Sequence, residues 1–181
     1  MVESNRTEIA VFGGGCFWCT EAMFSALRGV LSAMPGYSGG IKPNPSYEQV
    51  GGGKTGHAEV IKIEFDSDVI KFADLLEIFF ATHDPTTMNR PEGDVGEQYR
   101  SVIFYADLDQ EKAAIKLIAK LNKSGNFTSV IVTQVVPLEK FYGAEDYHHN
   151  YFAKNPEWAY CQAVINPKME KFRAKYGRVL K

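Results

Sequence analysis

Residues 11–21 read VFGGGCFWCTE, and they predict a strand, a tight turn and a helix in immediate succession. The apolar run at 9–12 suits a strand, and the three glycines after it permit turn conformations that a side chain would forbid. The helix is expected to begin at Cys16. A helix N-terminus presents free N–H groups and the positive end of a dipole, which favour the thiolate form of a cysteine. We therefore predict that Cys16 is a nucleophile, which a substrate can approach across the glycine turn.

Cys16 also has a structural and a metal-binding interpretation. A free cysteine is more often a buried structural residue, but the glycine turn and the helix start favour the reactive role here. Cys16 and Cys19 form a C-x-x-C, a spacing that redox proteins use and that permits a disulfide. Zinc would require a second compatible pair of ligands, and His148 and His149 are adjacent rather than spaced. The spacing therefore favours redox chemistry over a metal site.

The composition indicates one domain spanning residues 1–181, because a chain with 45% hydrophobic residues can build a sizeable core. The formal net charge of −2 gives no long-range reason to expect nucleic acid or an anionic membrane as a partner. Three cysteines do not make a disulfide framework, and the first residues lack the apolar segment of a signal peptide. No apolar run is long enough to cross a bilayer, so we expect a reducing, cytoplasmic setting.

Hydrophobic periodicity predicts the remaining elements. Apolar residues at 23, 24, 27, 30 and 31 share one helical stripe, which extends the first helix to Leu31, and residues 35–56 read as a long Gly- and Pro-rich loop. The other predicted elements are strands at 57–65, 100–105 and 130–136, helices at 72–80 and 167–176, a second loop at 83–98, and a helix capped by Asp107 or Asp109 and ended by Gly125.

The order βαβαβαβ, followed by an irregular tail, predicts an α+β fold. The strand at 57–65 is apolar on one face, which favours an antiparallel or mixed sheet with helices on one side. We therefore predict a split-βαβ, ferredoxin-like plait with a mixed sheet and an irregular C-terminal tail. The order alone also permits a parallel, doubly wound sheet.

Glu59 is an anomaly on that strand. Alternate residues of a strand share a face, so Glu59 points to the same side as Ile61, Ile63 and Phe65. A partly buried carboxylate usually pairs with a basic side chain. Alternatively, burial raises its pKa, so that it stays protonated and donates a proton near neutral pH. The residues alone leave both possibilities open.

Other polar residues also have two interpretations. Tyr47 and Tyr99 suit ordinary amphipathic packing or phenol donors aimed at an oxygen atom, and Asp94 in Gly-Asp-Val-Gly suits a turn. Three histidines are expected to be structural or surface residues rather than catalytic ones: His83, His148 and His149.

Five motifs together resemble the peptide methionine sulfoxide reductases of the A type. They are GCFWCTE at 15–21, GHAEV at 56–60, HDPT at 83–86, GDVGEQYRS at 93–101 and YHHNYF at 147–152. The resemblance runs from about Glu8 to about Tyr176, and the pairing of GCFW with TGHAE is highly specific. It implies an α+β plait and reduction of the S epimer of methionine sulfoxide, free or in proteins. It also implies a protein without cofactor or metal.

The resemblance assigns a role to each residue that matches a family motif. Cys16 matches the nucleophile, Glu59 the acid, and Asp94 a carboxylate that positions the substrate. The residues that match the phenols and the substrate-binding positions are Tyr47, Tyr99, Phe17, Trp18 and Gly15.

These residue types suit the implied reaction. A sulfoxide sulfur becomes electrophilic only when its oxygen is protonated, and a neutral acid with two phenols supplies the proton and hydrogen bonds. The thiolate attacks sulfur, Cys16 becomes a sulfenic acid, and methionine departs. A second thiol then forms a disulfide, which a partner reduces; by family analogy the partner is thioredoxin. We expect a monomer.

The sequence departs from the common family pattern at the resolving thiol. Cys19 stands where many members have glycine, and no glycine-rich tail with resolving cysteines follows. We favour Cys19 as the resolving residue, although its pairing would distort the first helical turn. Cys161 and an external thiol are the alternatives.

Two other functions remain as alternatives. A thioredoxin-like disulfide oxidoreductase would require Cys16 and Cys19 equally and would not need Glu59. A binding module would recognise oxidised methionine without turnover.

Overall fold

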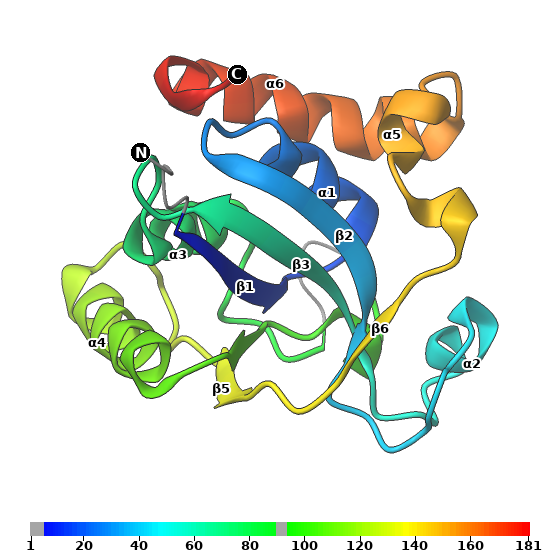
Figure 1. Cartoon of the computed structure of the whole chain (residues 1–181), viewed down its shortest axis with the longest axis horizontal. Helices are drawn as coiled ribbons and strands as arrows, with labels where there is room; N and C mark the ends of the chain where they lie inside the picture. Colours follow the sequence, from blue (N-terminus) through cyan, green and yellow to red (C-terminus); the bar gives the residue numbers. More distant parts are fainter. Residues whose placement is uncertain (1–5, 90–93) are drawn as a thin grey trace, which may run out of the picture.

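The computed structural model describes residues 6–89 and 94–181, and within them the chain forms a strongly twisted, six-stranded sheet (Figure 1). In sheet order the strands are β5 (Gln134–Pro137), β4 (Val102–Tyr105), β1 (Thr7–Gly13), β3 (Ala58–Asp66), β2 (Val30–Ser38) and β6 (Phe141–Gly143). β4 and β5 run parallel, and the other neighbouring pairs are antiparallel. The predicted α+β fold with a mixed sheet is confirmed. The doubly wound alternative is wrong, because β1 is antiparallel to both its neighbours.

The α-helices are α1 (Phe17–Ser25), α2 (Tyr47–Gly51), α3 (Phe72–Ala81), α4 (Leu108–Ser124), α5 (Tyr151–Lys154) and α6 (Asn166–Tyr176). α1 lies between the sheet and α6, and α3 and α4 pack against each other (Figure 1). Strand alternation places Phe12 in the main core, where its ring stacks on Phe79 of α3 at 4.8 Å between centroids. Val11 points to the opposite face, in a smaller apolar cluster. No helix in the described ranges is long and apolar enough to cross a membrane.

The first helix is shorter than predicted. It ends at Ser25 rather than Leu31, and Gly29 adopts a left-handed conformation, with φ of +86°, that turns the chain into β2. Leu27 is fully buried but Leu31 is half-exposed, so the apparent helical stripe is coincidental beyond Leu27.

The residues of β2 were predicted partly as helix and partly as loop because Pro35 and Gly36 lie inside the strand. A Cβ atom at Gly36 would lie 2.4 Å from the Phe141 ring and from the Tyr142 carbonyl oxygen, so the close approach of β6 requires glycine. The requirement comes from residues more than a hundred positions away, which is why the local composition indicates a loop. α2 also lies within the predicted loop at 35–56.

The C-terminal part differs in detail from the prediction. The strand predicted at 130–136 is the shorter β5, and β6 and α5 were not predicted. The last predicted helix is confirmed as α6, which continues from a single π-helical turn at Cys161–Ile165.

Asp107 is confirmed as the cap of α4. Its Oδ1 accepts hydrogen bonds from the backbone N–H groups of Asp109 and Gln110, both at 2.9 Å, and Gly125 ends the helix with φ of +75°. Asp107→Ala is expected to lower the free energy of unfolding by about 1 kcal/mol in urea titration, because two N–H groups of the first helical turn lose their acceptor. Asp109→Ala is the control, and equal losses in the two variants would contradict the assignment.

Candidate active site

Cys16 occupies the N-cap of α1, so the helix begins at Phe17, one residue after the predicted start. The chain reaches it through Gly15, which is left-handed with φ of +98°. The Cys16 backbone N–H donates to Asp94 Oδ2 at 3.3 Å, and the Thr20 hydroxyl donates to the Cys16 carbonyl at 3.1 Å. The cysteine that the sequence selects is therefore fixed at a helix N-terminus beside a carboxylate.

Glu59 lies on β3 with 2% of its surface exposed, and its Oε2 accepts the Phe17 N–H at 3.2 Å. The carboxyl group therefore meets the first turn of α1 directly beside Cys16. Burial, followed by the nearby Cys16, raises the pKa of Glu59 well above its ordinary value. No ion pair joins Glu59 to a basic side chain in the described part of the chain. Of the two possibilities left open, the structure favours a neutral carboxylic acid.

Tyr47 begins α2, and Tyr99 ends a 3₁₀ turn at Glu97–Tyr99. Burial, followed by the neighbouring Glu59, raises the pKa of Tyr47 to about 12 and raises that of Tyr99 as well. Both phenols also interact electrostatically with Cys16. The structure therefore brings two protonated hydroxyl donors to the same acid and thiol.

Tyr160 joins this group although the sequence did not indicate it. Its hydroxyl is hydrogen-bonded to both Cys16 and Cys19, and burial raises its pKa. The C-terminal part of the chain therefore contributes a third phenol to the site. In the sequence, the only indication of this role was that Tyr160 directly precedes Cys161.

The Cys16 and Cys19 thiols are hydrogen-bonded to each other across the first turn of α1. That hydrogen bond, followed by burial, raises the pKa of Cys16, and the same bond lowers the pKa of Cys19. The direction of this shift opposes the effect of the helix N-terminus, which favours the thiolate form of Cys16. The local pattern could not reveal the Cys19 partner's effect or the degree of burial.

Cys161 is fully buried at the start of the π-helical turn. Burial raises its pKa, and the nearby Cys16 contributes in the same direction. All three cysteines are free thiols. The structure thus places Cys161 within electrostatic reach of Cys16 but without exposure to solvent.

Phe17 and Trp18 follow Cys16 and point into aromatic surroundings. Phe17 is buried and lies 5.8 Å from the Tyr37 ring, centroid to centroid. Trp18 stacks on Tyr151 at 3.7 Å with an interplanar angle of 5°, and its Nε1–H donates to His148 Nδ1 at 2.9 Å. His148, predicted as a structural or surface residue rather than a catalytic one, is fully buried beside these aromatic rings.

Glu21, the last residue of GCFWCTE, fixes the tail against α1. Its Oε1 accepts the Asn150 N–H at 2.8 Å, at the start of α5, and burial raises its pKa. Asn150 has φ of +54°, a left-handed conformation that asparagine tolerates. This contact places Tyr151 over the Trp18 indole.

The other two histidines have structural contacts. His83 is buried, with Nδ1 2.7 Å from the Phe79 carbonyl oxygen and Nε2 2.7 Å from the Ser101 hydroxyl. His149 Nε2 lies 3.1 Å from the Ala144 carbonyl oxygen.

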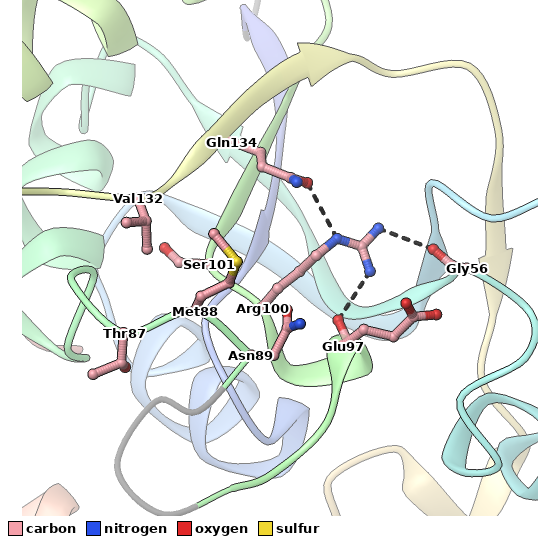
Figure 2. A pocket seen from close by; sticks show the side chains of 9 residues that line it. All are labelled: Gly56, Thr87, Met88, Asn89, Glu97, Arg100, Ser101, Val132 and Gln134. Carbon is pink, nitrogen blue, oxygen red and sulfur yellow. Dashed lines mark hydrogen bonds between the residues drawn. The ribbon is translucent and has the colours of Figure 1, made fainter.

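Arg100 ties two segments of the site together in the pocket of Figure 2. Its guanidinium donates to the carbonyl oxygens of Gly56 and Glu97, both at 2.9 Å, and to Gln134 Oε1 at 3.2 Å. Gly56 lies three residues before the acid, and Glu97 belongs to the 3₁₀ turn that carries the second phenol. Neither Glu59 nor Cys16 lines this pocket. Arg100 therefore acts on the reaction centre indirectly, by holding two of its segments together.

Arg100→Lys is expected to lower the kcat/KM of the reaction at Cys16 about tenfold, because a single ammonium cannot reproduce the planar guanidinium contacts with two carbonyl groups. Arg28→Lys is the control, since the Arg28 side chain donates to the Leu180 carbonyl oxygen, remote from the thiol. Equal activity of the two variants would show that the Arg100 guanidinium does not position Glu59 and Tyr99.

A free cysteine at a helix N-terminus, facing a neutral acid and phenol donors on an α+β fold, defines an oxidoreductase that works through a thiol. The sequence profile of the family described as Peptide methionine sulfoxide reductase matches residues 8–179. The chain belongs to this family.

Individual relatives also support the assignment to this family. The chain is 54% identical over 163 residues to the peptide methionine sulfoxide reductase MsrA of Nautilia profundicola, covering 90% of this chain and 92% of the relative. It is similar to the reduced form of Mxr1 from Saccharomyces cerevisiae, with a TM-score of 0.79, 34% identity, and coverage of 89% and 92%. Mxr1 in complex with Trx2 gives a TM-score of 0.56 at 24% identity, covering 83% and 88%, a likeness of fold alone.

Proposed function

We propose that the chain reduces the S epimer of methionine sulfoxide, protein-bound and free, to methionine. The observation that carries this proposal is the neutral Glu59 carboxyl placed beside Cys16 at the start of α1. Disulfide exchange has no leaving oxygen to protonate, whereas a sulfoxide oxygen must be protonated before it can leave. The peptide methionine sulfoxide reductases that the chain resembles share this activity by name.

The proposed reaction transfers the sulfoxide oxygen to sulfur on the protein. Glu59 gives its proton to the oxygen, and Tyr47 and Tyr99 donate hydrogen bonds as charge develops there. Cys16 sulfur attacks the sulfoxide sulfur, its thiol proton replaces the one that Glu59 gave, and the S–O bond breaks. The released oxygen then bonds to the Cys16 sulfur as the bond between the two sulfurs breaks and the thioether leaves. The balance is one thiol and one sulfoxide consumed, and one sulfenic acid and one thioether formed. Asp94, which accepts the Cys16 N–H, holds the turn and positions the substrate.

Phe17 and Trp18 form the proposed wall for the methyl group of the substrate. The adjacent Gly15 lets the sulfoxide approach the backbone without a side chain in the way. An apolar wall beside polar donors suits a ligand that has one methyl group and one oxygen on the same sulfur.

For recycling, Cys19 is proposed as the resolving thiol. Its sulfur is hydrogen-bonded to Cys16, and its lowered pKa makes it the better nucleophile toward the sulfenic acid. The step forms the Cys16–Cys19 disulfide and releases water, and thioredoxin returns both thiols. Mxr1, which the chain resembles, has been solved with Trx2. Cys161 is the internal alternative, and its complete burial weighs against it. An external thiol is the third possibility.

Mass spectrometry of the reduced protein after one equivalent of a peptide containing methionine-S-sulfoxide tests the proposal. We expect one reduced peptide per protein and a disulfide between Cys16 and Cys19. The R epimer serves as the control and should remain oxidised. Failure to reduce either epimer would leave only a binding module, and a Cys16–Cys161 disulfide would overturn the choice of resolving thiol.

We also assign the four central strands to a split-βαβ plait on one domain spanning the chain. Support comes from their order, β4-β1-β3-β2: the crossover through α1 joins β1 to β2 around β3, and that through α3 joins β3 to β4 around β1. The monomeric state and the cytoplasmic setting remain predictions.

A further inference from the structure

His148 is fully buried at the centre of an aromatic group that includes the proposed substrate wall. Ring centroids around it lie 4.0 Å (Tyr147), 4.5 Å (Tyr47), 5.0 Å (Phe17) and 5.7 Å (Trp18) away. The Trp18 indole is only a donor, so the 2.9 Å contact fixes His148 Nδ1 as the acceptor. The imidazole is therefore neutral, with its proton on Nε2.

Glu145 connects the same histidine to the other side of the site. Its Oε2 lies 3.2 Å from His148 Nε2, too far off axis for an aligned hydrogen bond, and accepts the Tyr37 hydroxyl at 3.2 Å. Its Oε1 accepts the Tyr47 backbone N–H at 3.0 Å. Burial lowers the pKa of His148 although Glu145 opposes the shift, in agreement with a neutral ring.

We propose that His148 is a positioning residue for sulfoxide reduction, which holds the Trp18 indole and lies beside Glu145, the carboxylate that binds the Tyr47 backbone N–H. This inference rests on the proposed roles of Trp18 and Tyr47. Trp18 and Tyr47 come from α1 and α2, twenty-nine residues apart. Tyr151 stacks on the face of the indole, and His148 Nδ1 accepts the indole N–H and so fixes the direction of that edge. Glu145, beside His148, holds the backbone N–H of the first residue of α2.

Loss of the acceptor leaves the buried indole N–H without a partner, so the indole is expected to leave its present orientation. The wall contacts the substrate methyl group both before and during reaction, and such contacts appear in KM rather than kcat. We therefore expect KM for the sulfoxide to rise about tenfold, with a smaller change in kcat, because Cys16 and Glu59 keep their own contacts.

Two substitutions separate hydrogen bonding from packing. His148→Asn keeps an acceptor near Nδ1 but loses the ring, whereas His148→Phe keeps the ring but cannot accept. Positioning through the hydrogen bond predicts that the Asn variant has the lower KM of the two. A ring that only fills space predicts the reverse order, and that order would overturn the proposal. His149→Asn is the control, with an expected KM equal to that of the wild type.

Two further readouts keep the test decisive. In wild-type protein labelled with nitrogen-15, the Trp18 indole N–H should be protected from exchange and His148 Nδ1 should be unprotonated; a rapidly exchanging indole would overturn the proposal even if both variants fail to fold. Trp18→Ala belongs in the same kinetic series. If it raises KM while the His148 variants do not, the inference alone fails. If Trp18→Ala leaves KM unchanged, the proposed wall fails and the inference with it.

Discussion

Glu59→Gln is expected to slow sulfoxide reduction by about 10²–10⁴-fold in a single turnover, because the amide cannot protonate the departing oxygen. The substitution is nearly isosteric, and its side-chain oxygen still accepts the Phe17 N–H, so the fold should be retained. Glu64→Gln is the matched control on the same strand, since Glu64 is partly exposed and pairs with Lys62. A Glu59→Gln protein with full activity would favour the thioredoxin-like alternative.

The same residue predicts the pH dependence of the wild type. The active form carries a protonated Glu59, and its raised pKa keeps the proton in place at pH values where an exposed glutamate is ionised. The rate should therefore be maintained at neutral pH and fall as the pH rises through that raised pKa. Glu59→Gln should lack this decline in single-turnover rate, and a wild-type profile that rises through the same range would contradict the assignment.

Cys19→Ser is expected to abolish thioredoxin-driven turnover while leaving the first reduction intact. The variant should yield about one methionine per protein molecule, since the sulfenic acid forms but has no internal thiol to resolve it. A quenched assay with one equivalent of sulfoxide, compared with a coupled steady-state assay, measures both stages. Cys161→Ser is the control and should cycle; if Cys161→Ser alone stops recycling, the resolving thiol is Cys161.

The chemistry of the site was easier to predict than its electrostatics. Strand alternation alone placed Glu59 on the apolar face, and the glycine turn located Cys16 at the N-terminus of α1. The direction in which the pKa of Cys16 shifts could not be predicted, because it depends on a hydrogen bond to Cys19 and on burial by distant segments. A local sequence pattern indicates on which face of its helix or strand a residue lies. It does not indicate which distant segments of the chain pack over that residue.

For the fold too, elements with a local signal were predicted well, and elements that depend on distant residues were not. The amphipathic α3 and the capped α4 were predicted nearly to the residue, since their signals lie within each helix. β2 was missed because the requirement for glycine at position 36 comes from the close approach of β6, not from the neighbouring residues in the sequence. Tyr160 and His148 were missed as site residues for a related reason, since they reach Cys16 and Trp18 from a tail whose position only the tertiary fold determines.

The contact between Trp18 and His148 spans 130 residues of chain. During synthesis, the nucleophile leaves the ribosome long before the histidine, and Tyr151 and Tyr160 follow later still. A nascent chain therefore contains the Cys16 sulfur before the C-terminal residues that surround the site are present. Catalytic competence begins only when the last third of the polypeptide has emerged and docked, so the onset of activity during translation reports completion of the fold.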